Sequence, residues 1–241
     1  MSAREIAEER HHSLDVFLVE VRMDKVKHNL LQIQEKIAPY KPNIIAVTKY
    51  FPESAIIEAY DAGLRDFGES RVIEASEKIN NLPDEIKKNS KFHFIGHLQT
   101  NKVKRAVEVF DFIHSVDSVK LAEKISQEAG EIGKTQKVFV QINNANEEQK
   151  FGFSKEEIFE EFGKIISFKH LKVIGLMNMA PLGADDKELK RLFSEVREIK
   201  ENLESKFGYE LKELSMGMSQ DYVIAAQEGA TMLRIGRKLF E

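Results

Sequence analysis

Ile44-Ile45-Ala46-Val47-Thr48-Lys49 is a short apolar run that ends in a lysine. A run of this length is typical of a buried strand. After Pro42, similar runs alternate with helical patterns, as expected for parallel strands joined by crossover helices. We predict eight strands, near Ile44–Lys49, Asp66–Gly68, Lys91–Ile95, Phe112–Val116, Val138–Ile142, Val173–Met177, Glu213–Met216 and Met232–Ile235. We predict seven helices, and so none after the last strand, near Pro52–Ala62, Ser70–Ile79, Lys102–Glu108, Ser118–Ala129, Lys155–Ile166, Asp186–Lys206 and Ser219–Glu228.

This alternation predicts an α/β fold, a single (β/α)8 TIM barrel, in a chain of 241 residues. Strands of such a barrel are buried on both faces, which explains their apolar runs. Apolar residues from Leu14 to Ile37 have helical spacing. We predict that this N-terminal helix fills the helix position left empty after the eighth strand. No linker, repeat or low-complexity tract divides the chain, so we expect residues 1–241 to form one domain.

The composition excludes several classes of function. It is 42% hydrophobic and 32% charged, as in ordinary globular proteins, and the absence of cysteine excludes disulfides, thiolate metal sites and cysteine nucleophiles. The net charge is −4 and no basic stretch is interleaved with aromatics, so we expect no nucleic-acid partner. No run approaches ~18 apolar residues and the N-terminus is charged, which predicts a cytoplasmic protein without a membrane span.

Lys49 is the first candidate functional residue. In a TIM barrel, functional groups gather at the C-terminal ends of the strands, where the loops converge over one mouth. An amine that is partly desolvated beside other cations loses basicity and gains the neutral form that a Schiff base requires. The alternative is a strand-end lysine that extends its ammonium into water.

Ser219 and two glycines, Gly217 and Gly236, suggest an anion site near the end of the chain. A serine at a helix N-cap leaves backbone N–H groups free to hold an anion, and loops after strands seven and eight of TIM barrels often bind phosphate. Ordinary helix capping and an ordinary turn would explain the same residues. With Lys49, the pattern suggests a phosphate cofactor that carries a carbonyl group.

Arg234 lies inside the run Met232-Leu233-Arg234-Ile235-Gly236, where both strand faces should be buried. An unpaired buried guanidinium is very costly, so Arg234 must pair with a carboxylate, reach the mouth or donate to a ligand. Facing a pyridine nitrogen, it would leave that nitrogen unprotonated and weaken the cofactor as an electron sink. His93 and His97 lack further ligands, so we assign no metal, and Asp111, Asp117 and Asp221 stay without a role.

Several motifs together resemble one known family. The chain resembles the YggS/PROSC family of pyridoxal phosphate homeostasis proteins, which is related in fold to the N-terminal barrel of alanine racemase. The resemblance runs nearly end to end. It rests on Ala46-Val47-Thr48-Lys49, Gly63-Leu64-Arg65-Asp66-Phe67-Gly68-Glu69, His93-Phe94-Ile95-Gly96-His97-Leu98-Gln99-Thr100-Asn101-Lys102, Ile113-His114-Ser115-Val116-Asp117, Lys150-Phe151-Gly152-Phe153, Gly175-Leu176-Met177 and Leu214-Ser215-Met216-Gly217-Met218-Ser219-Gln220-Asp221.

The resemblance implies a site for pyridoxal 5'-phosphate (PLP). It places a Schiff base on Lys49, the phosphate around Ser219 and the backbone after Gly236, and Arg234 against the pyridine nitrogen. Gly217, Met218 and Arg237 complete the expected cofactor-binding residues.

Members of this family lack the second domain of alanine racemase, so the resemblance implies PLP homeostasis without robust catalysis. No catalytic residue is assigned. The expected partners are PLP and PLP-dependent apo-enzymes, with the chain a monomer or weak dimer. A racemase-like PLP enzyme and a scaffold with a vestigial pocket are the alternatives.

The sequence departs from the family pattern at four positions. Ser70 and Arg71 stand where Asn and Tyr are common, Phe92 replaces a frequent Trp, and Arg237 follows Gly236 where Thr is frequent. Arg237 could add a side-chain charge to the phosphate site or contribute only its backbone N–H.

Overall fold

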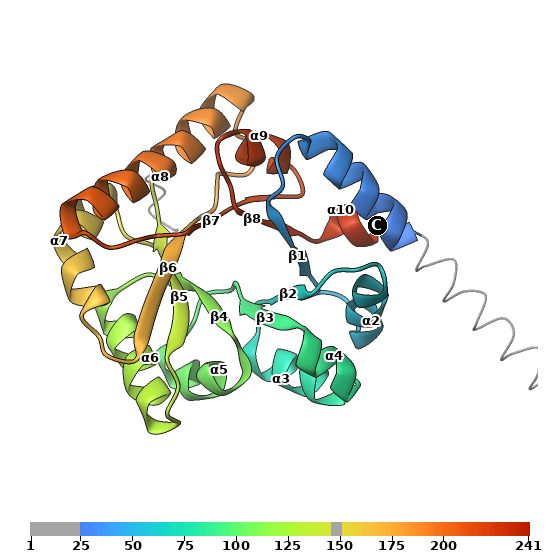
Figure 1. Cartoon of the computed structure of the whole chain (residues 1–241), viewed down its shortest axis with the longest axis horizontal. Helices are drawn as coiled ribbons and strands as arrows, with labels where there is room; N and C mark the ends of the chain where they lie inside the picture. Colours follow the sequence, from blue (N-terminus) through green and yellow to red (C-terminus); the bar gives the residue numbers. More distant parts are fainter. Residues whose placement is uncertain (1–24, 146–150) are drawn as a thin grey trace, which may run out of the picture.

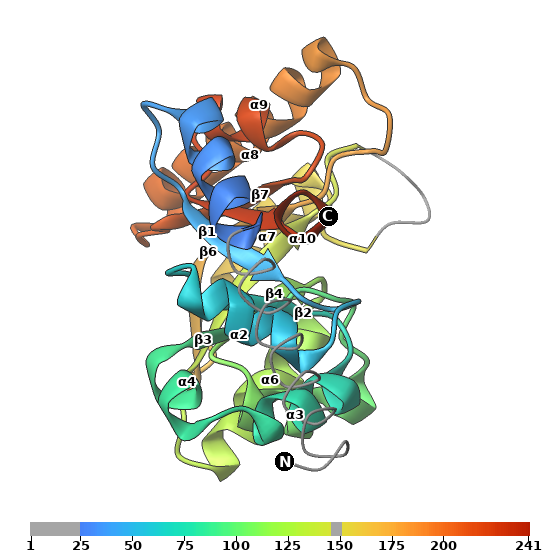
Figure 2. The same ribbon diagram turned by 90° about the vertical axis from the view of Figure 1, so that its right-hand side faces the viewer.

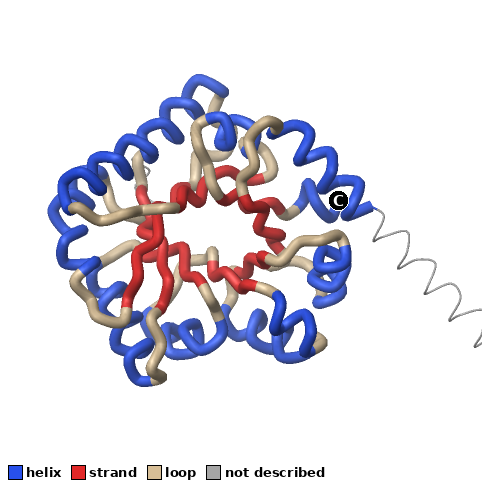
Figure 3. The backbone as a smooth tube through the Cα atoms, in the orientation of Figure 1, coloured by secondary structure: helices blue, strands red, loops and turns tan. Residues whose placement is uncertain are grey.

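Eight parallel strands close into a barrel in the computed structural model, which describes residues 25–145 and 151–241 (Figure 3). Each strand pairs with the next along the chain, and β1 closes the barrel by pairing with β8. The predicted (β/α)8 barrel is therefore confirmed. The strands are β1 (Asn43–Val47), β2 (Asp66–Glu69), β3 (Lys91–Phe94), β4 (Phe112–Val116), β5 (Gln136–Ile142), β6 (Leu171–Asn178), β7 (Glu213–Met218) and β8 (Met232–Ile235).

Helices surround the strands as a ring (Figure 1). All seven predicted helices are present, and the 3-10 turn η1 and the short helices α4 and α10 were not predicted. The helical elements, predicted and unpredicted together, are α2 (Glu53–Asp61), α3 (Val72–Asn81), α4 (Asp84–Asn89), η1 (Thr100–Lys102), α5 (Val103–Val109), α6 (Val119–Glu131), α7 (Lys155–Ile166), α8 (Asp186–Phe207), α9 (Tyr222–Gln227) and α10 (Arg237–Phe240).

Local signals explain where the best-defined helices begin and end. Ser154 and Glu157 form a reciprocal capping box at the start of α7, which satisfies two backbone N–H groups. Helix α8 ends at Gly208, whose φ of 62° is a left-handed conformation that glycine adopts without steric cost.

The last helix position is filled from both ends of the chain. Residues 25–37 are helical, and Figures 1 and 2 place them beside α10. The side chain of Asn29 donates a hydrogen bond to the Leu239 carbonyl at 3.0 Å. The expectation that β8 has no helix after it was wrong, because α10 follows directly. The predicted helical segment at residues 14–24 lies outside the described residues.

Two layers of side chains pack the barrel. The larger apolar cluster lies between the strands and the helices, whereas a smaller cluster combines Ile45, Phe112, Phe139, Met177 and Met232 from five different strands. This alternation follows from the period of two along a strand. Within the described residues, no helix combines the length and apolarity needed to cross a lipid bilayer.

Candidate functional site

A cavity of about 450 Å³ lies where β1, β6, β7 and β8 end. This is the face on which TIM barrels carry their functional groups. The cavity brings together six of the seven residues predicted as a site, namely Lys49, Met218, Ser219, Arg234, Gly236 and Arg237. Residues separated by more than 180 positions thus share one opening.

Lys49 lies in the turn that follows β1, two residues after the strand ends at Val47. It is half-buried and lines the cavity. Its Nζ lies 5.0 Å from the ring centroid of Tyr50, within the range of a cation–π contact.

A buried polar group holds the backbone next to this lysine. Lys78 Nζ donates to the Thr48 carbonyl at 2.9 Å and to Glu69 Oε1 at 2.7 Å. The Thr48 hydroxyl donates to the same Glu69 oxygen at 2.7 Å. Because Thr48 and Glu69 are buried, these bonds fix the point at which the chain leaves β1.

Ser219 lines the same cavity, in the turn between β7 and α9. The prediction that it caps the following helix was wrong, because α9 begins at Tyr222 and Asp221 takes the N-cap position. The Ser219 hydroxyl instead accepts a long hydrogen bond, 3.4 Å, from the backbone N–H of Lys238. Ser219 therefore connects the turn that follows β7 to α10, the helix that follows β8.

Gly217 does not line the cavity but shapes its wall. Its φ is 91°, and a Cβ atom there would lie 2.5 Å from Ala225 Cβ and 2.9 Å from a Leu233 methyl group. It lies where β7 carries an extra residue relative to β8, between the pairs Ser215↔Met232 and Met218↔Arg234. Only glycine fits this bulge without displacing its neighbours.

Arg234 is held inside the barrel and is only 4% exposed. Its two terminal nitrogens donate to Ser215 Oγ and to the Asn178 carbonyl, each at 2.7 Å. No carboxylate among the described residues forms an ion pair with it. Burial lowers the pKa of Arg234 to about 10, and the Asp221 carboxylate opposes part of this shift. The guanidinium therefore stays charged at neutral pH. It lines the cavity instead of forming a structural ion pair.

The charge of the cavity lining is positive. Its charged residues are Lys49, Arg234 and Arg237 and a single carboxylate, Asp221. Burial raises the pKa of Asp221. Val47, Ile95 and Met179 supply apolar wall. An amine, a buried guanidinium and a hydroxyl around such walls fit a flat molecule that carries a carbonyl and an anionic group.

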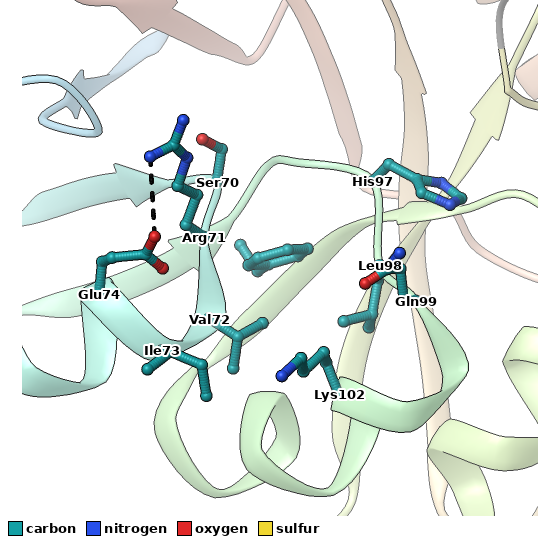
Figure 4. A pocket seen from close by; sticks show the side chains of 10 residues that line it. Ser70, Arg71, Val72, Ile73, Glu74, His97, Leu98, Gln99 and Lys102 are labelled. Carbon is teal, nitrogen blue, oxygen red and sulfur yellow. Dashed lines mark ion pairs between the residues drawn. The ribbon is translucent and has the colours of Figure 1, made fainter.

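The four departures from the family pattern lie in different places. Arg237 is exposed at the rim of the cavity. Ser70 and Arg71 line a separate hollow of about 200 Å³, where Arg71 turns to Glu74 (Figure 4). Phe92 is buried in the larger apolar cluster, between the strands and the helices, and its ring centroid lies 6.0 Å from that of Phe67. Arg237 is thus the one of these four that touches the candidate site.

The sequence interpretation missed two buried polar residues behind the site. Ser215 accepts the hydrogen bond from Arg234, and His114 contacts Ser215 from β4 with an Nδ1 to Oγ distance of 2.9 Å. Each is a polar residue inside an apolar strand run. That is the signal that identified Arg234, so it could have identified them too.

Comparisons with known proteins agree with this fold and place the chain in a family. The family model described as "Alanine racemase, N-terminal domain" matches residues 21–240. A pyridoxal phosphate homeostasis protein of Synechocystis sp. is 40% identical over 208 residues, which cover 86% of this chain and 94% of that protein. The protein of the same name from Escherichia coli K12 is 33% identical over 230 residues, 90% of this chain and 97% of that protein.

A solved structure shows the same barrel. The structure of PipY from Synechococcus elongatus with PLP bound superposes with a TM-score of 0.80 and is 37% identical, covering 90% of this chain and all of that chain. An alanine racemase of Clostridium difficile, 15% identical with a TM-score of 0.74, shares the fold. The chain therefore belongs to the alanine racemase N-terminal domain family, in which it is similar over almost its whole length to pyridoxal phosphate homeostasis proteins.

Proposed function

We propose that this chain binds PLP and takes part in PLP homeostasis inside the cell, without robust catalysis. The observation that carries the proposal is that one cavity joins Lys49, Ser219, Arg234 and Gly236 at the mouth of the barrel. PipY, which shares this barrel, has been solved with PLP bound, and similar full-length proteins are named for PLP homeostasis. PLP, when bound, supplies an aldehyde, a pyridine nitrogen and a phosphate.

Each of these three groups has a partner in the cavity. Lys49 supplies the amine that holds the aldehyde as a Schiff base. Ser219, with the backbone that follows Gly236, holds the phosphate, and the exposed side chain of Arg237 adds positive charge beside it. Gly217 and Met218 shape the wall at the end of β7.

Arg234 faces the pyridine nitrogen in this proposal. A guanidinium donates hydrogen bonds and keeps its protons, so it leaves that nitrogen unprotonated. An unprotonated ring is a weak electron sink, which favours holding and releasing the cofactor over carbanion chemistry. PLP-dependent apo-enzymes are the partners that such a protein would serve, and we expect a monomer or weak dimer.

The test compares wild type with Lys49→Ala. Purified wild-type protein should develop visible absorbance with PLP, and borohydride should fix the cofactor to Lys49, as mapped by mass spectrometry. Lys102→Ala is the matched control, because Lys102 lines the separate hollow in Figure 4. If Lys49→Ala takes up and fixes PLP as wild type does, the proposal is wrong.

Two further assays separate the alternatives. A racemase-like enzyme would exchange the Cα hydrogen of amino acids for deuterium in a reaction that depends on Lys49. A scaffold with a vestigial pocket would keep its cellular function in complementation with Lys49→Ala. We expect no exchange across a broad amino-acid panel and no complementation.

A further inference from the structure

Five polar side chains form a hydrogen-bonded row through the barrel interior. Arg234 donates to Ser215 Oγ at 2.7 Å, and Ser215 Oγ lies 2.9 Å from His114 Nδ1. His114 Nε2 lies 2.9 Å from His93 Nδ1, and His93 Nε2 lies 2.8 Å from Asp66 Oδ1. Both histidines are fully buried. The row therefore connects β8, β7, β4, β3 and β2 in that order.

The two ends of the row set the direction of the two terminal bonds. A guanidinium can only donate, and a carboxylate can only accept. His93 donates from Nε2 to Asp66. If each ring carries one proton, Nδ1 of His93 accepts from Nε2 of His114, and Nδ1 of His114 accepts the proton of Ser215, whose oxygen still accepts from Arg234. All four imidazole nitrogens then have a partner.

Electrostatics agree with this assignment. Burial lowers the pKa of His114 well below 6.5, and His93 and Arg234 lower it further. At the other end, burial opposes the charged form of Asp66, but its hydrogen bond from His93 and its other neighbours outweigh this and lower the pKa of its carboxyl. The row thus holds a cation at one end, an anion at the other and His114 as a neutral ring between them.

The far end of the row reaches the opposite face of the barrel. Asp66 is the first residue of β2, and it lines a cavity of about 820 Å³ that also includes Asn43, the first residue of β1. Leu30 and Ile37, from the helix at residues 25–37, line the same cavity. The row therefore joins the two ends of the barrel, and none of Asp66, His93 and His114 lines the mouth cavity.

We propose that His114, His93 and Asp66 are positioning residues for the cofactor site. They orient the Ser215 hydroxyl so that it accepts from Arg234, and with the Asn178 carbonyl this holds the guanidinium in one orientation at the mouth cavity. The inference rests on the proposed function, because the group that Arg234 faces is part of that proposal. A row that served stability alone would leave the cofactor unaffected by changes at Asp66.

The bond directions can be tested on protein without cofactor. Nitrogen-15 NMR of the imidazole side chains should show both His93 and His114 as the Nε2–H tautomer. Ser215→Ala should shift the Nδ1 resonance of His114, whereas the matched control His170→Gln, at a half-buried histidine outside the row, should not. A doubly protonated ring or an Nδ1–H tautomer at neutral pH in either residue would overturn the assignment.

The positioning role is tested by changing Asp66, which does not line the mouth cavity, and measuring cofactor affinity and absorbance. Asp66→Leu removes the acceptor, whereas Asp66→Asn keeps an acceptor oxygen. We expect Asp66→Leu to bind PLP about tenfold more weakly and to change the pH dependence of the bound-cofactor absorbance, as expected for losing one hydrogen-bonded connection. Asp66→Asn should behave as wild type. Thermal melts confirm that both variants are folded under the titration conditions.

A second pair of variants examines the near end. Ser215→Ala and His114→Phe should each weaken PLP binding about tenfold, and the double variant should lose no more than either, because both break one row. Phenylalanine at 114 keeps an aromatic ring against Phe139, whose centroid lies 4.0 Å from that of His114.

The two proposals fail separately. If Lys49 carries the cofactor but Asp66→Leu and Ser215→Ala bind as wild type, the positioning role is wrong and the proposed function stands. If Lys49→Ala binds as wild type while the NMR shows the expected tautomers, the proposed function fails and the assignment of the row survives.

Discussion

Met218 and Asp221 are joined by two hydrogen bonds that close the turn carrying Ser219. The backbone N–H of Met218 donates to Asp221 Oδ1 at 2.5 Å, and the backbone N–H of Asp221 donates to the Met218 carbonyl at 3.1 Å. The turn follows the bulge of β7 and lies directly before α9. It therefore sets where the Ser219 hydroxyl lies in the mouth cavity.

Asp221→Ala should weaken PLP binding by about tenfold, because it removes a hydrogen bond to a backbone group that is worth about 1–3 kcal/mol when buried. Asp221→Asn keeps the acceptor oxygen and should bind nearly as wild type. Equilibrium titration of the cofactor absorbance measures both. An equal loss in the two variants would show that the charge of Asp221 matters rather than the turn.

Gly217→Ala should destabilise the fold by about 3 kcal/mol, because the new methyl group would overlap Ala225 and Leu233 in a backbone conformation that L residues rarely adopt. Gly133→Ala is the matched control. Gly133 also has a positive φ, 66°, but its Cβ would have no atom within 4 Å, so only the conformational cost of about 1 kcal/mol remains. Urea unfolding of the two variants gives the difference. Equal losses would contradict the close packing at the bulge of β7.

Lys78→Met should lower the free energy of unfolding by about 3–5 kcal/mol, because it leaves the carboxylate of Glu69 buried without its ammonium. The double variant Lys78→Met/Glu69→Leu should recover part of this loss. Arg191→Met, which breaks the exposed pair with Glu188, is the control and should change stability little. Chemical denaturation of the four proteins decides the outcome. A double variant less stable than Lys78→Met would argue against an uncompensated buried charge.

The stability of the chain should depend on pH through His114. Its pKa in the fold is well below 6.5, so below pH 6.5 the unfolded chain binds a proton there that the folded chain does not. The contribution of His114 is therefore complete above about pH 6.5 and declines as the pH falls toward the folded pKa, by up to about 1.4 kcal/mol per pH unit.

Between pH 6.5 and 5, wild type should accordingly lose more stability than His114→Gln, as measured by denaturant unfolding at each pH. His28→Gln, at an exposed histidine, should keep the wild-type slope. If the slope of His114→Gln equals that of wild type, His114 is charged in the folded protein or does not contribute.

The element pattern of the barrel could be read from sequence because it is local. Apolar runs such as Ile44–Val47 indicate strands that are buried on both faces, and helical spacing between the runs indicates helices that are buried on one face. The misses were short elements, α4, η1 and α10, in which a few residues carry too little periodicity to be recognised. Whether the residues gathered at the mouth bind a cofactor stays a prediction.

The sequence by itself determined that strands and helices alternate, and that Lys49 and Arg234 lie where an amine and a buried cation need partners. Only the tertiary structure decided which partners they have. Ser215 and His114 are 101 residues apart, and they meet because barrel closure and the bulge in β7 set the strand register. Periodicity shows which side of a strand is buried, but contacts across a barrel depend on the stagger of all eight strands, which no single segment encodes.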